Sequence, residues 1–142
     1  MDVTLKLICR KLPGLVFQDY QPVHLGLQRG KEVVEIVPAA KRQVTYWVPL
    51  TVELKGKRVR LKGPFVQGKP DDPFLYLAWG VMKGSTFDMF RRAKIGLKHL
   101  TPATLQQHVR SGKPLEATVF CTDAHGCPIC ATVPDDFIDW KF

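Results

Sequence analysis

Arg91 lies in a stretch of the sequence where its charge is difficult to place in solvent. If residues 90–98 form a strand, Arg91 falls on the same face as Ala93, Ile95 and Leu97, because alternate residues of a strand share a face. An unpaired guanidinium is costly to bury, so Arg91 requires a partner. One alternative is structural: an internal salt bridge, or a stem lying along the apolar surface with its head in water. The other is functional, because the planar guanidinium binds carboxylates and phosphates in a bidentate manner.

The functional alternative predicts a pocket around Arg91. Tyr76 and Trp79 would supply its aromatic wall and Gln67 an amide contact, giving the mostly apolar lining that is typical of ligand sites. We therefore expect a small-molecule-binding, β-barrel-like domain whose ligand is anionic and partly apolar. The sequence contains no GxSxG, HExxH, Walker A or GxGxxG motif. It assigns no catalytic residue and leaves open whether the chain is an enzyme.

A second candidate site is a run of five positive residues within eight positions: Lys55, Lys57, Arg58, Arg60 and Lys62. Such a run on a short hairpin is usually a solvated face. The alternative function is a nucleic-acid-binding or protein-interaction module that uses hairpin 55–62, with Lys69, Arg92, Lys94 and Lys98 assisting. Against nucleic acid, no aromatic residue is interleaved with these charges in the sequence to stack on bases.

The third constellation is Cys121, His125, Cys127 and Cys130, whose thiolates and imidazole are ligands that zinc prefers. However, the residues around Cys130 have the composition of a strand, and positions three apart on a strand point to opposite faces. A second CxxC is absent from the sequence. We therefore expect no metal and no cofactor, with these four residues as the weaker zinc alternative.

Composition and charge set limits on the class of protein. The chain of 142 residues is 45% hydrophobic and 24% charged, which fits a single globular domain spanning residues 1–142. The net charge of +8 combines +11 over residues 1–110 with −3 over residues 111–142. A basic body of this kind suits nucleic acid or an anionic small molecule as a partner. No apolar run is long enough to cross a bilayer, and residues 1–6 lack the apolar core of a secretory signal, so we expect a cytoplasmic protein with no membrane segment; its oligomeric state stays open.

Period-two alternation of apolar and polar residues recurs along the chain, most clearly over residues 44–54. Residues 74–79 are apolar on both faces, which predicts a central strand with both sides covered. Helical signals are confined to 101–112, where Thr101 suits the N-cap and Gly112 the C-terminal end. The fold class predicted is mostly β (α+β): a small antiparallel β-barrel or sandwich of about eight strands with one or two short helices.

Two local features sharpen this prediction. Pro49 lies on the face opposite to the apolar residues of the strand expected over residues 44–54. Because proline has no backbone N–H, this predicts an edge position or a bulge there. Residues 115–121 and 127–133 are both strand-like and flank a short polar segment, which predicts a hairpin.

The sequence also resembles an uncharacterised family of small bacterial proteins that is catalogued only as a domain of unknown function. The resemblance spans nearly the whole chain and is most specific between Phe74 and Lys94. Its motifs are Gln28-Arg29-Gly30-Lys31-Glu32, Pro64-Phe65-Val66-Gln67-Gly68, Phe74-Leu75-Tyr76-Leu77-Ala78-Trp79-Gly80 and Phe90-Arg91-Arg92-Ala93-Lys94. The resemblance implies a bacterial, cytoplasmic origin and carries no activity, cofactor or partner.

Overall fold

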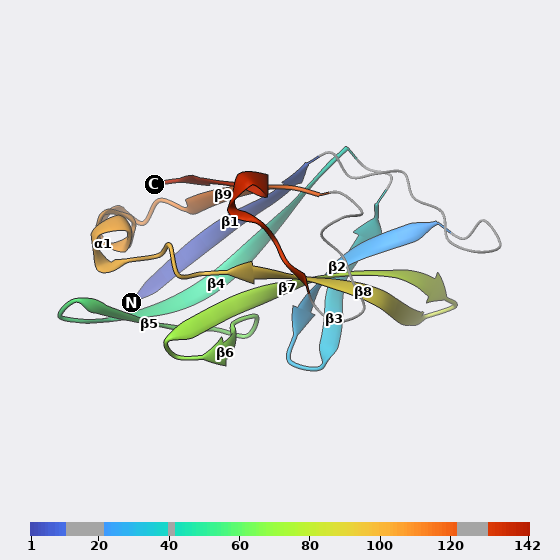
Figure 1. Cartoon of the computed structure of the whole chain (residues 1–142), viewed down its shortest axis with the longest axis horizontal. Helices are drawn as coiled ribbons and strands as arrows, with labels where there is room; N and C mark the ends of the chain where they lie inside the picture. The colour runs from blue at the N-terminus through green and yellow to red at the C-terminus, as the bar shows by residue number, and fades with distance from the viewer. Residues whose placement is uncertain (11–21, 40–41, 122–130) are drawn as a thin grey trace.

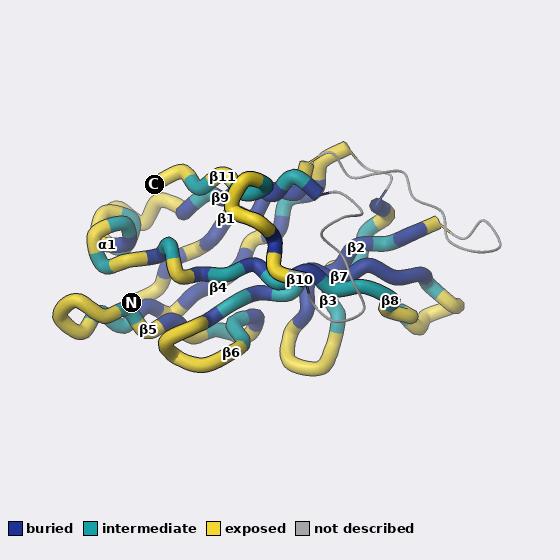
Figure 2. The backbone as a smooth tube through the Cα atoms, viewed as in Figure 1, coloured by how far each residue is buried: buried dark blue, intermediate teal, exposed yellow. Residues whose placement is uncertain are grey.

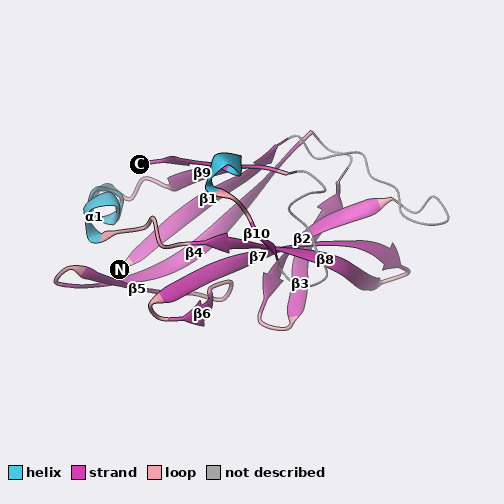
Figure 3. Cartoon of the chain, in the orientation of Figure 1, coloured by secondary structure: helices cyan, strands magenta, loops and turns pink. Residues whose placement is uncertain are grey.

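The computed structural model describes residues 1–10, 22–39, 42–121 and 131–142 (Figure 1). As predicted, the fold is mostly β, with two sheets packed face to face and one α-helix (Figure 3). The strands are β1 (Asp2–Arg10), β2 (Val23–Arg29), β3 (Glu32–Pro38), β4 (Gln43–Lys55), β5 (Arg58–Lys62), β6 (Gln67–Lys69), β7 (Asp72–Lys83), β8 (Thr86–Gly96), β9 (Leu115–Phe120), β10 (Ala131–Thr132) and β11 (Ile138–Lys141).

The first sheet has the order β11-β9-β1-β4-β5 and curls into a half-barrel. Its longest strand, β4, pairs with β1 from Gln43 to Thr51 and with β5 from Thr51 to Lys55. Pro49 therefore lies where β4 has only β1 beside it in the ladder, which is locally an edge. This satisfies the requirement that a proline, which has no backbone N–H, avoid the middle of a sheet.

The second sheet has the order β10-β8-β7-β2-β3, and β6 pairs with the start of β7. The strand predicted to be central, β7, lies between β8 and β2. A bulge near Trp79 and Gly80 shifts its register against β8. The tight connection between β2 and β3 is made by Gly30, whose φ of 61° lies in the left-handed region that favours glycine.

The core lies between the two sheets and is filled by alternate residues of the long strands (Figure 2). In β4 these are Val44, Tyr46, Val48, Leu50 and Val52, and in β7 they include Leu75, Leu77 and Trp79. The only polar group that β4 sends inward, the hydroxyl of Tyr46, donates a hydrogen bond of 3.1 Å to the carbonyl of Leu25 on β2. This bond joins the two sheets directly and satisfies a hydroxyl that would otherwise be costly to bury.

Helix α1 (Pro102–Ser111) begins and ends as predicted. The Thr101 side chain caps the N-terminus through the backbone N–H of Thr104, and Gly112 ends the helix in the left-handed conformation. Leu105 is the helix residue that is fully buried against the core. No helix in the described part of the chain has the length and apolar character that crossing a bilayer requires.

The predicted hairpin of 115–121 with 127–133 is wrong. β9 pairs in parallel with β1 and antiparallel with β11 in the first sheet, whereas β10 pairs in parallel with β8 in the second. A strand-like composition fixes the local conformation but not the neighbouring strand, and here β9 and β10 belong to different sheets.

Replacement of Tyr46 by Phe tests the bond between the sheets. Loss of the hydroxyl leaves the Leu25 carbonyl without this donor, and we expect the free energy of unfolding at pH 7 to fall by about 1 kcal/mol. Burial raises the pKa of Tyr46 above its ordinary value of 10. The folded state therefore holds this proton more tightly than the unfolded state, and its contribution to stability is complete below pH 10 and decreases at higher pH.

Urea unfolding at pH 7 and above pH 10 measures both effects, with Trp47→Phe, exposed and adjacent on β4, as the control. Y46F should lose stability at pH 7 and show a weaker decline above pH 10 than the wild type. Equal stability of Y46F and the wild type at pH 7 would show that the bond does not join the sheets.

Candidate functional site

The four residues expected to form a ligand pocket are distributed over both faces of the second sheet. Arg91 is directly opposite Trp79 in the β7–β8 ladder, so both point to the inner face. Gln67 is opposite Phe74, which places it with Tyr76 on the outer face. Tyr76 and Trp79 are three residues apart and so point to opposite sides of β7. The structure therefore pairs Arg91 with Trp79, and Gln67 with Tyr76, and does not bring the four together.

Arg91 lies on the inner face, as its alternation with Ala93, Ile95 and Leu97 predicts. It is half-buried beside the bulge, and its guanidinium carbon lies 5.9 Å from the centre of the Phe90 ring. Trp79, 3% exposed, is part of the core. The role of Arg91 in holding an anionic ligand stays a prediction.

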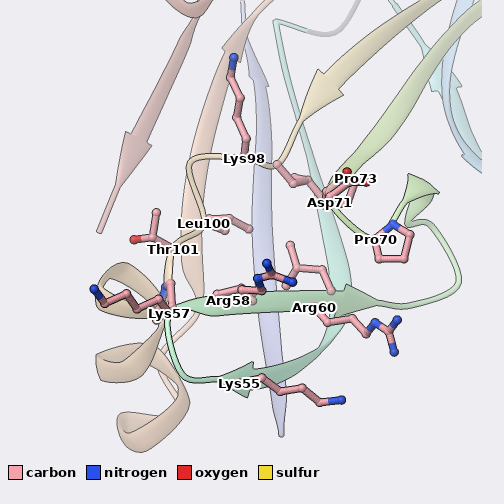
Figure 4. Close-up of a pocket in the computed structure, with 14 residues that line it drawn as sticks. Lys55, Lys57, Arg58, Arg60, Pro70, Asp71, Pro73, Lys98, Leu100 and Thr101 are labelled. Atoms are coloured by element: carbon pink, nitrogen blue, oxygen red, sulfur yellow. The ribbon is translucent and has the colours of Figure 1, made fainter.

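The predicted basic hairpin does line a cleft, of about 720 Å³, at the end of the molecule where α1 lies (Figures 1 and 4). One wall is the β4–β5 hairpin of the first sheet, and the other consists of the turn at 70–73 and the segment 97–102. In β5, Arg58 and Arg60 are exposed, whereas Val59 and Leu61 point inward. The floor is accordingly apolar, formed by Val59, Leu61, Pro73, Leu97 and Leu100, and the rim carries Lys55, Lys57, Arg58, Arg60 and Lys98.

A second cleft of about 390 Å³ shares Arg60, Leu61, Pro70 and Pro73 with the first. It adds Lys62, Lys69 and Gln67 from the end of β5 and from β6. We call the two adjoining clefts the basic groove. Seven cationic side chains line it, namely Lys55, Lys57, Arg58, Arg60, Lys62, Lys69 and Lys98, and the one carboxylate among its lining residues is Asp71.

Most of these cations are outside any ion pair in the described part of the chain. Within the described ranges, an ion pair involves only one residue of the groove: Lys62 Nζ lies 3.4 Å from Glu53 Oε1. That contact lowers the pKa of Glu53 through a hydrogen bond and through the charge of Lys62. Elsewhere Lys6, Lys83 and Lys141 are neutralised by Glu116 or Asp88. Six of the seven groove cations thus lie near one another without an ion pair in the described ranges, and such a cluster attracts anions.

Two other cations named from the sequence, Arg92 and Lys94, lie on the outer face of the second sheet. The guanidinium carbon of Arg92 is 4.7 Å from the centre of the Tyr76 ring, and Lys94 Nζ is 4.3 Å from that of Phe74. For these two cations, the objection that no aromatic residue is interleaved with the charges therefore does not hold in three dimensions, whereas the described residues that line the two clefts around the hairpin include no aromatic residue. The rings come from the neighbouring strand, β7, where the one-dimensional sequence cannot show them beside β8.

The cysteine constellation is only partly within the described residues. His125, Cys127 and Cys130 lie outside them, whereas Cys121 is fully buried beside Cys9 of β1. A hydrogen bond to the Cys121 thiol, together with burial, raises the pKa of Cys9 well above its ordinary value, which keeps this thiol neutral and unreactive. In the described ranges, no group of three or more His, Cys, Asp or Glu side chains could hold a metal ion.

One pair was missed altogether by the sequence reasoning. His99 Nε2 lies 3.3 Å from Asp135 Oδ1, although the two residues are 36 positions apart. Both side chains are more than a third exposed, which suits a surface contact. Sequence spacing carried no signal for it, because the contact depends on how the segment after β8 meets the segment after β10.

Comparison with protein families gives one match: a family of unknown function, DUF5990, whose sequence model covers residues 3–142. Comparison with curated proteins and with solved structures gives no match.

The pairing of Lys62 with Glu53 can be tested by titration. In Lys62→Met the pKa of the Glu53 carboxyl should rise towards its ordinary value of 4.5, because both the hydrogen bond and the main opposing charge are lost. Lys55→Met, which removes a weaker electrostatic contribution, should raise it less. Carboxyl carbon chemical shifts followed by NMR between pH 2 and 7 measure both changes. An unchanged pKa in K62M would mean that Lys62 is as free as the other cations of the groove.

Proposed function

We propose a function from the geometry alone, because the chain belongs to DUF5990, a family of unknown function that lends it no activity. The domain binds nucleic acid, and the basic groove holds the phosphate backbone. The observation that carries this proposal is the charge of the groove, which has seven cationic side chains and one carboxylate along its lining.

The number and distribution of these charges favour a polymer over a small ion. A single carboxylate or phosphate is satisfied by one or two cations. Here the cations come from the hairpin, β6 and the segment after β8, and they follow two adjoining clefts. Figure 4 shows Lys57 extending to the side of the hairpin opposite to Lys55 and Arg60, so that the three do not converge on one point. A chain of phosphates can contact such a series in succession, releasing a counterion at each contact.

The apolar floor of the first cleft favours a second candidate, an anionic small molecule with an apolar part. Val59, Leu61 and Leu100 would contact the apolar part, and Arg58 and Lys98 the anionic group. This is the ligand class expected from the sequence, held by residues of the hairpin and of the segment 97–102 instead of Arg91.

The double variant Arg58→Ala/Arg60→Ala tests the groove. With a labelled, unstructured oligonucleotide, we expect affinity in 50 mM salt to fall roughly tenfold, and the slope of log affinity against log salt to become shallower by about 1.4, because two phosphate contacts are lost. Fluorescence anisotropy at several salt concentrations measures both quantities.

Arg10→Ala/Arg42→Ala is the matched control. It removes the same charge at the opposite end of the thirteen-residue strand β4, about 40 Å from the hairpin. Its affinity and salt slope should remain near those of the wild type. Equal losses in the two double variants would mean that net charge alone attracts the oligonucleotide, and undetectable binding of the wild type in 50 mM salt would refute the proposal.

The length of the ligand separates the two candidates. A polymer held along the groove should bind more tightly as the oligonucleotide lengthens from a mononucleotide until the groove is filled, because contacts are added one by one. If the first cleft instead holds a small molecule, a mononucleotide should bind as tightly as a longer strand. Anisotropy competition with strands of increasing length distinguishes the two dependences.

A further inference from the structure

The outer face of β7 and β8 carries alternating rings and cations that adjoin the basic groove. Phe74 and Tyr76 point outward because Leu75 and Leu77 point into the core. Arg92 and Lys94 point outward for the same reason, with Ala93 and Ile95 inward. We call Phe74, Tyr76, Arg92 and Lys94 the aromatic ladder. All four are half-buried, so part of each side chain remains accessible to solvent.

The register of the strands explains how each cation reaches its ring. Lys94 is directly opposite Tyr76, and Arg92 is directly opposite Ala78. Each cation leans diagonally, Arg92 over Tyr76 and Lys94 over Phe74, which is within the reach of long side chains. The small side chain of Ala78 leaves room beside Arg92. The two cations lie about 6.6 Å apart along the strand.

Arg92 is held in place from a second side by Gln28 of β2. Its Nη1 donates a hydrogen bond of 3.5 Å to Oε1 of Gln28, whose own amide nitrogen donates to the carbonyl of Gly30 at 3.0 Å. Gln28 is only 7% exposed. A guanidinium plane fixed over an aromatic ring presents its other side as a flat, positively charged surface, which suits stacking of a nucleobase.

Strand β6 connects the aromatic ladder to the groove. Gln67 lines the second cleft and is directly opposite Phe74 in the β6–β7 ladder. Gly68 also lines that cleft, and a Cβ atom there would lie 2.6 Å from Cε1 of Phe74, so the ring packs against the glycine backbone. The groove and the ladder are therefore separated only by a strand three residues long.

We propose that the nucleic acid is single-stranded, with its phosphates in the basic groove and its bases stacked on the aromatic ladder. This inference rests on the function proposed above and names its substrate class. The bases of a duplex are already paired and stacked, whereas unpaired bases can turn outward onto aromatic rings and guanidinium planes. If the aromatic ladder only stabilised the sheet, removal of its rings would not change the affinity for bases.

Three probes of equal length separate the ladder from the groove: an unstructured strand, the same sugar–phosphate strand without bases, and a duplex. The base-free strand keeps the phosphates and cannot stack. The wild type should bind the unstructured strand at least tenfold more tightly than the base-free strand, since stacking contributes about that factor or more for each base. It should also prefer the unstructured strand to the duplex.

The variant Phe74→Leu/Tyr76→Leu removes both rings and keeps apolar side chains on the strand. Its affinity for the unstructured strand should fall to that of the base-free strand, while binding of the base-free strand is unchanged. Tyr76→Phe, which keeps the ring, should retain wild-type affinity. Arg92→Lys keeps the charge and loses the planar guanidinium. It should weaken binding of the unstructured strand and leave binding of the base-free strand unchanged. Trp47→Leu is the control, because Trp47 is an exposed ring under a cation, Lys6, on the outer face of the first sheet.

The outcomes distinguish this inference from the function on which it rests. Suppose that the wild type binds the unstructured and base-free strands equally and that R58A/R60A weakens both. This result would contradict base stacking on the aromatic ladder and would support phosphate binding in the basic groove. No binding of any probe would overturn both. Thermal unfolding of each variant shows whether it remains folded, and a loss of affinity that Y76F shares with the Leu variant would also count against stacking.

Discussion

The alternate apolar side chains of β4 and β7 must be covered, and the two sheets cover each other. This constraint determines the rest of the structure. Val48 and Leu50 of β4 and Leu75 and Leu77 of β7 are almost completely buried, and the hydroxyl of Tyr46 spans the core to the backbone of β2. Because side chains alternate along a strand, burying one set fixes the other set on the outside. The positions of the hairpin cations and of the aromatic ladder follow from this.

The basic groove forms where the covering of one sheet by the other ends. The β4–β5 hairpin comes from the first sheet, and the turn at 70–73 and the segment 97–102 flank strands of the second. Buried residues such as Leu61 and Leu97 form the floor, while their polar neighbours form the rim. Outside the groove several lysines are matched with carboxylates, whereas six of the seven cations of the groove have no ion pair in the described ranges. Such an arrangement gains most from an anionic partner.

Local features of the fold could be predicted from the sequence, and contacts between distant segments could not. Alternation identified the strand around Arg91 and its inward face, and the cap residues identified α1. The pocket of Arg91, Tyr76, Trp79 and Gln67 assumed that nearness in sequence meant nearness on one face, which three-residue spacing prevents. The hairpin 115–133 assumed that successive strands pair, whereas β9 joins β1. The contact of Arg92 with the Tyr76 ring depends on the β7–β8 register, which no single segment encodes.

Mapping the bound nucleic acid residue by residue tests the central claim most directly. In an NMR titration of the isotope-labelled protein with an unstructured oligonucleotide, the backbone amide signals of residues 55–62, Lys69 and Lys98 should move together. The signals of residues 74–76 and 92–94 should follow with the same binding curve, and those around Trp47 on the first sheet should remain in place. Shifts confined to the face around Trp47, or scattered over all exposed lysines and arginines, would contradict a specific basic groove.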